Sequence, residues 1–269
     1  MAVVTISSEM GSGAPAIGMA LAQRLHYRLI DREVITEAAH RYGLLEAKLV
    51  ELDERKPSLV QRFDVETRRY ILGTQAALCE FAEADNVVLM GRGGQWLLRG
   101  IPHVLRVRVT APFEVRVQRV AHTMSQGGPS RSVVDLVRRD DAGRAGRTRY
   151  LYDIDIADPS LYDVVINTAT LTTEAAVDLL TVILQRPELT TTAVAQSLVG
   201  DRVLSSRVEI ALATHPNTRK LKIAVKAKDG VVTLQGAAGL DTAAVVARDV
   251  TGVRDVHTGE IPPIVQFPA

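Results

Sequence analysis

Short apolar runs, often of β-branched residues, alternate with longer segments of helical periodicity through the first 185 residues. The runs predict five strands, at residues 3–6, 28–30, 86–90, 104–109 and 163–166. Nearly continuous apolar runs are typical of strands that are buried on both faces of a parallel sheet. The segments between them predict helices at residues 14–26, 33–83, 112–124, 131–149 and 173–184. This alternation predicts an α/β doubly wound fold, a parallel sheet with helices on both faces.

The pattern changes after residue 185. Residues 186–200 are predicted to be a linker with room for a short helix, and Asp201 is predicted to cap a helix over residues 202–213. Residues 220–228 then alternate polar and apolar, and Asp229-Gly230 separates them from a second strand-like run, which is a strong hairpin signal.

A further helix is expected between a cap at Asp241 and Gly252, followed by a strand at residues 253–258. The domain prediction is therefore a P-loop domain at 1–185, a linker at 186–200, a small α+β domain at 201–261 and a Pro-rich tail at 262–269.

Composition narrows the function classes. The chain has 269 residues and a formal net charge of +1, so no overall field favours nucleic acid as a partner. No apolar stretch approaches the roughly 20 residues that a membrane span requires, and no basic region precedes the first strand as in a signal peptide, so we expect a cytoplasmic protein. The one cysteine, Cys79, has apolar neighbours and is expected to be a buried helical residue.

The first strand leads into Gly11-Ser12-Gly13 and then into a helix, an arrangement that points backbone N–H groups at one spot and suits a phosphate. In the phosphate-loop pattern Gly-x-x-x-x-Gly-Lys-[Ser/Thr], Ala14 stands at the lysine position. Pro15 stands at the hydroxyl position and has no N–H group to donate. The loop therefore lacks its usual cation.

Arginine is the available substitute, because only Lys48 and Lys56 precede residue 220. Arg92 follows a predicted strand at the sheet edge where α/β proteins bind ligands. Gly127-Gly128-Pro129 has the composition of a hinge, and the segment behind it has the arginine density of a phosphate-clamping lid. Its arginines are Arg131, Arg138, Arg139, Arg144, Arg147 and Arg149. Taken singly, each of them is better explained as part of a solvated helix face.

Asp31 ends the second predicted strand. Its carboxylate could orient a ribose, a base or a metal ion, and it could equally cap the following helix. The sequence supports both interpretations about equally.

Five segments resemble, in the same order, the cytidylate-kinase-like family of P-loop nucleoside monophosphate kinases. They are Val4–Ser7 with the Gly-Ser-Gly turn, Ile30–Glu33, Val88–Gly93, Asp141–Arg144 with Tyr150–Tyr152, and Asp158–Asn167. The resemblance implies transfer of the γ-phosphoryl group of ATP, with Mg2+, to CMP or a similar acceptor. It places Gly11, Ser12 and Gly13 on the ATP phosphates. It places Asp31 and Arg92 at the acceptor, and Arg144 with Arg139 on the transferring group.

The C-terminal part resembles a BON domain, through Asp229–Gly236 and Val250–Val256. That resemblance implies a module for a small ligand or a phospholipid. The face that carries Lys220, Lys222, Lys226 and Lys228 could meet a membrane surface, although a solvated outer face of a small sheet explains the same residues better.

The sequence supports two main functions. In the first, the chain is an active nucleotide kinase whose arginines replace the missing lysine, since phosphoryl transfer depends on positioning and charge neutralisation. In the second, it is a kinase-derived nucleotide sensor coupled to the C-terminal module, because losing a single preorganised donor can cost about 3 kcal/mol of transition-state stabilisation. A membrane-surface adaptor is a third, weaker hypothesis.

Overall fold

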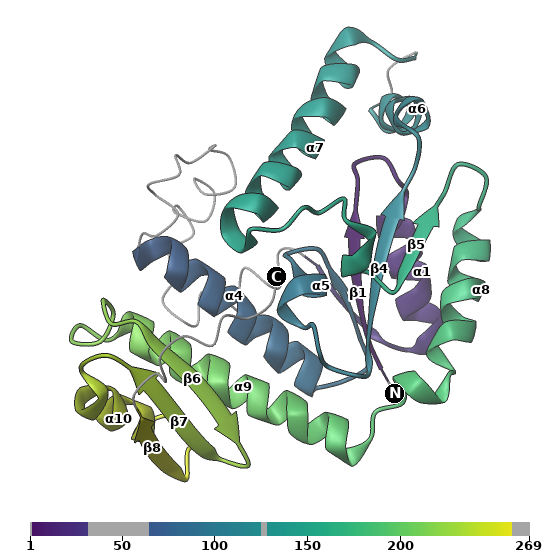
Figure 1. Ribbon diagram of the computed structural model, residues 1–269. Helices are drawn as coiled ribbons and strands as arrows, with labels where there is room; N and C mark the ends of the chain where they lie inside the picture. The colour runs from purple at the N-terminus through teal and green to yellow at the C-terminus, as the bar shows by residue number, and fades with distance from the viewer. Residues whose placement is uncertain (1, 32–64, 125–127, 260–269) are drawn as a thin grey trace.

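The N-terminal part is built on a parallel β-sheet in a computed structural model that describes residues 2–31, 65–124 and 128–259 (Figure 1). The strands are β1 (Val3–Ser8), β2 (Arg28–Ile30), β3 (Val87–Met90), β4 (Val104–Thr110) and β5 (Val164–Asn167). They lie in the order β2-β3-β1-β4-β5 and all pair in parallel. The α/β fold with a parallel sheet is confirmed, and each predicted strand lies within two residues of its observed bounds.

Helices cover both faces of this sheet. One face buries its apolar side chains against α1 (Ala14–Leu25) and α8 (Thr173–Leu184). The other packs against α4 (Val65–Glu83), the short α5 (Gly94–Leu97) and the first half of α9 (Ala193–Thr214). Both faces are therefore core, which explains the nearly continuous apolar runs of the strands.

Two helices stand beyond the carboxyl edge of the sheet, at the top of Figure 1: α6 (Phe113–Thr123) and α7 (Arg131–Tyr152). They are packed together by an apolar cluster that includes Val117, Val120, Val133 and Val137. Short 3₁₀ turns at Pro159–Leu161 (η2) and Pro187–Leu189 (η3) complete the connections. Since the carboxyl edge is where α/β sheets bind ligands, α6 and α7 are placed to form the walls of a site.

Some predictions fall outside the described residues. Of the helix predicted over 33–83, the structure describes residues 65–83, which are helical. Gly127 of the predicted hinge, Lys48, Lys56 and the tail at 262–269 also lie outside them.

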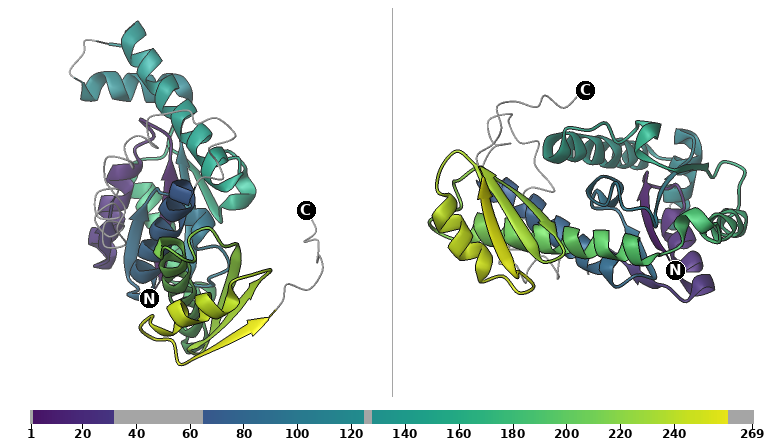
Figure 2. Two further views of the ribbon diagram at one scale, coloured as in Figure 1. Left: turned by 90° about the vertical axis from the view of Figure 1, so that its left-hand side faces the viewer. Right: turned by 60° about the horizontal axis from the view of Figure 1, so that its bottom comes forward.

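The predicted linker and the predicted cap at Asp201 are wrong. Residues 193–214 form the single helix α9, and its first turn is capped by Thr192, whose Oγ1 accepts a hydrogen bond from the Ala195 N–H (3.1 Å). Asp201 lies inside the helix, where its carboxylate accepts the Asp229 N–H (2.7 Å). Figure 2 shows this long helix running from the parallel sheet into the C-terminal part.

The C-terminal unit consists of the second half of α9, β6 (Ile223–Lys228), β7 (Val231–Gly236), α10 (Leu240–Arg248) and β8 (Asp255–Gly259). The predicted α-β-β-α-β order is confirmed. β6 and β7 form the hairpin at Asp229-Gly230, where both residues have positive φ (49° and 79°), and β8 adds in parallel to β7. The predicted cap at Asp241 is wrong, since α10 begins after Gly239 with no side-chain cap and Asp241 lies in its first turn.

Cys79 is fully buried on α4, as predicted. Burial raises the pKa of its thiol to about 11, and the Ser206 hydroxyl on α9 donates to its Sγ (3.8 Å). A thiol in this setting stays protonated and packs as a small apolar group. Across the described part of the chain, no helix is long and apolar enough to cross a membrane.

Candidate functional site

The loop between β1 and α1 forms the base of the candidate site. Gly11 and Gly13 adopt positive φ angles (77° and 84°), and α1 starts directly at Ala14. The first N–H groups of a helix have no acceptor inside it, and a Cβ placed on Gly13 would meet no atom of the described residues within 4 Å. The fully buried Ser12 hydroxyl has no hydrogen-bond partner in the part of the chain that the structure describes. This loop therefore offers unused donors next to open space, which fits a phosphate group.

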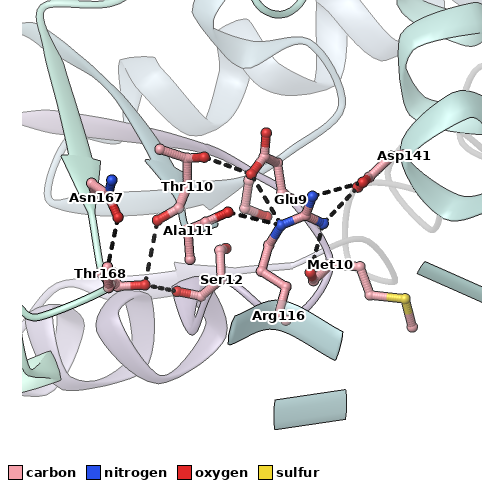
Figure 3. Close-up of polar contacts among 12 residues, drawn as sticks. Glu9, Met10, Ser12, Thr110, Ala111, Arg116, Asp141, Asn167 and Thr168 are labelled. Carbon is pink, nitrogen blue, oxygen red and sulfur yellow. Dashed lines mark hydrogen bonds and ion pairs between the residues drawn. The ribbon is translucent and has the colours of Figure 1, made fainter. Parts of the chain in front are cut away.

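The carboxylate of Glu9, in the loop, pairs with buried arginine side chains, and Figure 3 shows its contact with Arg116. Glu9 contacts Arg108 of β4 (3.2 Å) and Arg116 of α6 (3.3 Å), and it accepts a hydrogen bond from the Thr110 hydroxyl (2.5 Å). Arg116 also pairs with Asp141 of α7 (2.9 Å). One buried guanidinium thus joins the phosphate loop, α6 and α7.

Two arginines of α6 also donate to backbone carbonyls of the loop. Arg116 Nη1 donates to the Met10 oxygen (3.2 Å), and Arg119 Nη1 donates to the Gly11 oxygen (3.5 Å). Arg119 is held from the other side by Thr168, whose hydroxyl donates to the Ser12 oxygen (2.8 Å). The loop is therefore lined by guanidinium groups although it contains no lysine.

Arg144 is brought to the loop and Arg139 is not. Arg144 lies on α7 with its Nη1 3.5 Å from the Ser8 carbonyl oxygen, and Asp140 holds its Nε (2.6 Å). Arg139 is exposed on the same helix, and its Nε donates to the Asp135 oxygen one turn earlier (3.2 Å). Arg144 can therefore reach an anion on the loop, whereas the role predicted for Arg139 has no supporting contact among the described residues.

Arg92 and Asp31 follow the neighbouring strands β3 and β2 at the carboxyl edge, as predicted. Arg92 has a positive φ (55°), its Nη1 donates to the Tyr70 hydroxyl of α4 (3.2 Å), and its carbonyl accepts the Tyr152 hydroxyl (3.4 Å). Burial raises the pKa of Tyr152, which keeps this hydroxyl protonated as a donor. Asp31 is exposed.

The sequence pattern did not indicate five residues of the site, which are Glu9, Arg108, Arg116, Arg119 and Tyr70. A signal existed for two of them, because Arg116 and Arg119 are three residues apart in a helix that follows a strand, and residues at that spacing share a helix face. Nothing in the local pattern identifies the partners of Glu9 or Tyr70, which lie on elements distant in the chain.

The site fits the nucleotide phosphates better than it fits a protein-bound metal. Pro15 and Ala16 place no hydroxyl at the start of α1, and the acidic Glu9 is already paired with two arginines. Within residues 2–31, 65–124 and 128–259, no group of three or more His, Cys, Asp or Glu side chains could hold a metal ion. Magnesium in proteins often keeps only one or two carboxylate ligands and takes the rest from phosphates and water.

Comparison with known proteins shows which family the chain belongs to. The model of the cytidylate kinase-like family matches residues 3–170, more than half of the chain and the whole of the loop, β3 and α7. The chain belongs to the cytidylate kinase-like family.

Individual cytidylate kinases are also similar in sequence to this chain. The cytidylate kinase of Sulfolobus acidocaldarius is 27% identical over 187 residues, which cover 69% of this chain and 96% of that protein. The cytidylate kinase of Ignicoccus hospitalis is 30% identical over 181 residues, covering 66% and 96%. Both matches span nearly the whole relative, so the remaining third of this chain is additional to the kinase-like part.

Among solved structures, an uncharacterized protein from Eubacterium ventriosum superimposes with a TM-score of 0.54 at 15% identity. The match covers 69% of this chain and all of that one. At this identity the likeness establishes the fold alone, an α/β fold with a parallel sheet.

Proposed function

We propose that this protein is a nucleotide kinase that transfers the γ-phosphoryl group of ATP to CMP or a similar nucleoside monophosphate. The observation that carries the proposal is that Arg144 of α7 reaches the end of β1, where its Nη1 lies 3.5 Å from the Ser8 carbonyl oxygen, next to the loop that holds Gly11–Gly13. Membership of the cytidylate kinase-like family supports it, as does the likeness to curated cytidylate kinases.

In this proposal the loop N–H groups and the positive end of α1 bind the ATP phosphates. Arg144 lies at the end of β1, beside the start of the loop, where its planar fork can bind an oxygen pair of the transferring phosphoryl group. Arg92, at the end of β3, binds the phosphate of the acceptor. The protein thereby supplies position and positive charge, which account for most of the catalysis in phosphoryl transfer. Magnesium bound to the ATP phosphates would neutralise part of their charge.

The test is to titrate the purified chain with ATP–magnesium and with CMP by calorimetry and to follow ADP release with CMP, dCMP and UMP as acceptors. We expect both ligands to bind and CMP to stimulate ADP release. Binding without turnover would contradict the kinase and favour the nucleotide sensor. That sensor should gain activity from the triple substitution Ala14→Lys, Pro15→Gly and Ala16→Thr, which restores a lysine, an N–H group and a hydroxyl.

The resemblance of the C-terminal unit to a BON domain, its phospholipid or small-molecule ligand and the division of the chain into two domains remain proposals. The element order of the unit and its outward-facing lysines support them, since Lys226 and Lys228 are both exposed on β6. Vesicles of anionic phospholipid would test the lipid ligand, and the four-lysine variant Lys220→Ser, Lys222→Ser, Lys226→Ser, Lys228→Ser is the matched control. Binding of the wild type and not of the variant would support it.

A further inference from the structure

The C-terminal unit is anchored along almost the whole length of α4. At the start of that helix, Arg68 Nη1 donates to the Leu221 carbonyl oxygen just before β6 (2.8 Å). In its middle, Gln75 Nε2 donates to the Ser206 hydroxyl (3.1 Å) and to Glu209 (3.2 Å) of α9. Near its end, Glu80 pairs with Arg207 (3.0 Å). Figures 1 and 2 show α4 and α9 side by side.

The same start of α4 contacts the candidate site from the opposite side. Tyr70, two residues after Arg68, is buried and accepts a hydrogen bond from Arg92 (3.2 Å). One turn earlier, the Thr67 hydroxyl bonds the Tyr150 hydroxyl at the end of α7 (3.1 Å). The first turn of α4 therefore contacts the C-terminal unit, Arg92 and α7.

Of these contacts, the hydrogen bond between Arg92 and Tyr70 is the one that can orient a side chain of the candidate site. A guanidinium on a strand-end loop has many rotamers, and one hydrogen bond that it donates to a buried hydroxyl selects among them. The ordering of Tyr70 depends in turn on where the first turn of α4 lies. Arg68 fixes that turn to the C-terminal unit at a point more than 150 residues away in the chain.

We propose that the C-terminal unit positions Arg92 for the acceptor phosphate, acting through Arg68 and Tyr70 of α4. In this role Arg68 and Tyr70 are positioning residues, and the unit sets acceptor affinity without contacting the acceptor. The inference rests on the proposed function for the identity of the acceptor, CMP, but the structural link itself does not depend on any ligand.

The first experiment needs no nucleotide. Hydrogen exchange of the segment 91–98 is compared among the full-length wild type, Arg68→Ala, Arg68→Lys and the control Arg24→Ala. Arg24 carries an exposed ion pair with Asp178 on the other face of the sheet (2.5 Å). We expect faster exchange in Arg68→Ala alone, with Arg68→Lys close to wild type because it keeps a donor for the Leu221 oxygen. Equal exchange in Arg68→Ala and Arg24→Ala would overturn the proposal.

The second experiment measures CMP and ATP affinity by calorimetry. Losing one hydrogen bond is worth about 1 kcal/mol, so Arg68→Ala and Tyr70→Phe should each raise the Kd for CMP about fivefold. The Kd for ATP should not change, because ATP binds at the loop. The double variant should be no weaker than the worse single one, since both changes break the same link.

Equal weakening of both ligands, or additive effects, would overturn the inference while leaving the kinase proposal intact. Failure of the wild type to bind CMP would overturn the kinase proposal, and hydrogen exchange would then decide the positioning role alone.

Discussion

Gly11 is the residue of the phosphate loop with the least freedom to change. Its φ of 77° is costly for any residue with a Cβ, and a Cβ there would come within 2.7 Å of the Arg116 carbonyl oxygen. We expect Gly11→Ala to lower the free energy of unfolding by about 1–3 kcal/mol and to abolish ATP binding, because the loop N–H groups must shift. Chemical denaturation and ATP calorimetry measure the two effects.

The matched control is Gly143→Ala on α7, where a Cβ meets no atom within 4 Å and the backbone is helical. This change should raise the free energy of unfolding by up to about 1 kcal/mol and leave ATP affinity unaltered. Equal behaviour of the two alanine variants would mean that Gly11 is an ordinary turn residue.

Arg144 and Arg139 both lie on α7, so comparing their variants tests whether contact with the site, rather than position on this helix, is needed for catalysis. Arg144 reaches the Ser8 carbonyl oxygen at the end of β1, next to the loop, whereas Arg139 bonds within its own helix, so Arg144→Ala should lower kcat about 10²–10³-fold, the size expected for one preorganised donor. Arg139→Ala, an exposed substitution, should change kcat by no more than about twofold. Steady-state kinetics with CMP checks both. The assignment fails if the two variants lose activity equally.

Sequence alone indicated the glycine loop and Arg92 as candidates, because each follows a predicted strand, and it indicated Arg144 through the arginine density of its segment. It missed the pairing of Glu9 with Arg108 and Arg116, since these residues are brought together only when β1, β4 and α6 meet. The arginines of α6 that contact the loop, Arg116 and Arg119, also come from outside it, and no spacing rule within the loop could indicate them.

At the scale of elements, α9 shows where local signals mislead. Thr190–Thr192, Gly200 and Asp201 suggested a linker and a later helix start. Glycine inside a helix costs about 1 kcal/mol, but Val199, Val203, Val208 and Leu212 are all buried along α9 and offset that cost. Tertiary packing thus overrides propensity, whereas α8, which has a clear cap at Thr172 and a regular period, was predicted with the observed bounds.

The contact between α4 and α9 should make stability depend on pH through Glu209. Burial raises the pKa of this carboxyl to about 7, against the opposing effects of Arg202, Arg68 and the bond from Gln75. The folded state therefore binds a proton more tightly than the unfolded chain, whose glutamates titrate near 4.5. The stabilisation is fully present below about pH 4.5 and is lost as pH rises towards about 7.

Glu209→Gln mimics the protonated carboxyl and should remove this decline. We expect the variant to match the wild type near pH 5 and to exceed it by about 1–3 kcal/mol at pH 8, at 1.36 kcal/mol per pKa unit. Urea denaturation between pH 5 and pH 8 measures this. Glu188→Gln, at an exposed side chain, serves as the control and should follow the wild type throughout. A wild type and a Glu209→Gln variant with parallel pH profiles would contradict the assignment.

For the whole molecule, the helix α9 contributes to the cores of both parts of the chain. Val199 and Val203 belong to the core of the parallel sheet, and Leu204, Val208 and Leu212 belong to the core of the C-terminal unit. Neither core is complete without this helix. Sequence predicted both sets of strands correctly but placed a linker where the two cores are joined.

Two cores that share one rigid helix should unfold together. We expect a single calorimetric transition for the full chain, with the calorimetric enthalpy equal to the van't Hoff enthalpy. Val199→Ala, in the first core, should lower the stability of this one transition by about 2 kcal/mol through lost burial and a residual cavity. Val194→Ala, exposed on the same helix, should leave it unchanged. Two resolved transitions, only one of which shifts its midpoint temperature in Val199→Ala, would show instead that α9 links two separately folding domains. The proposed effect of the C-terminal unit on Arg92 would then lose its structural support.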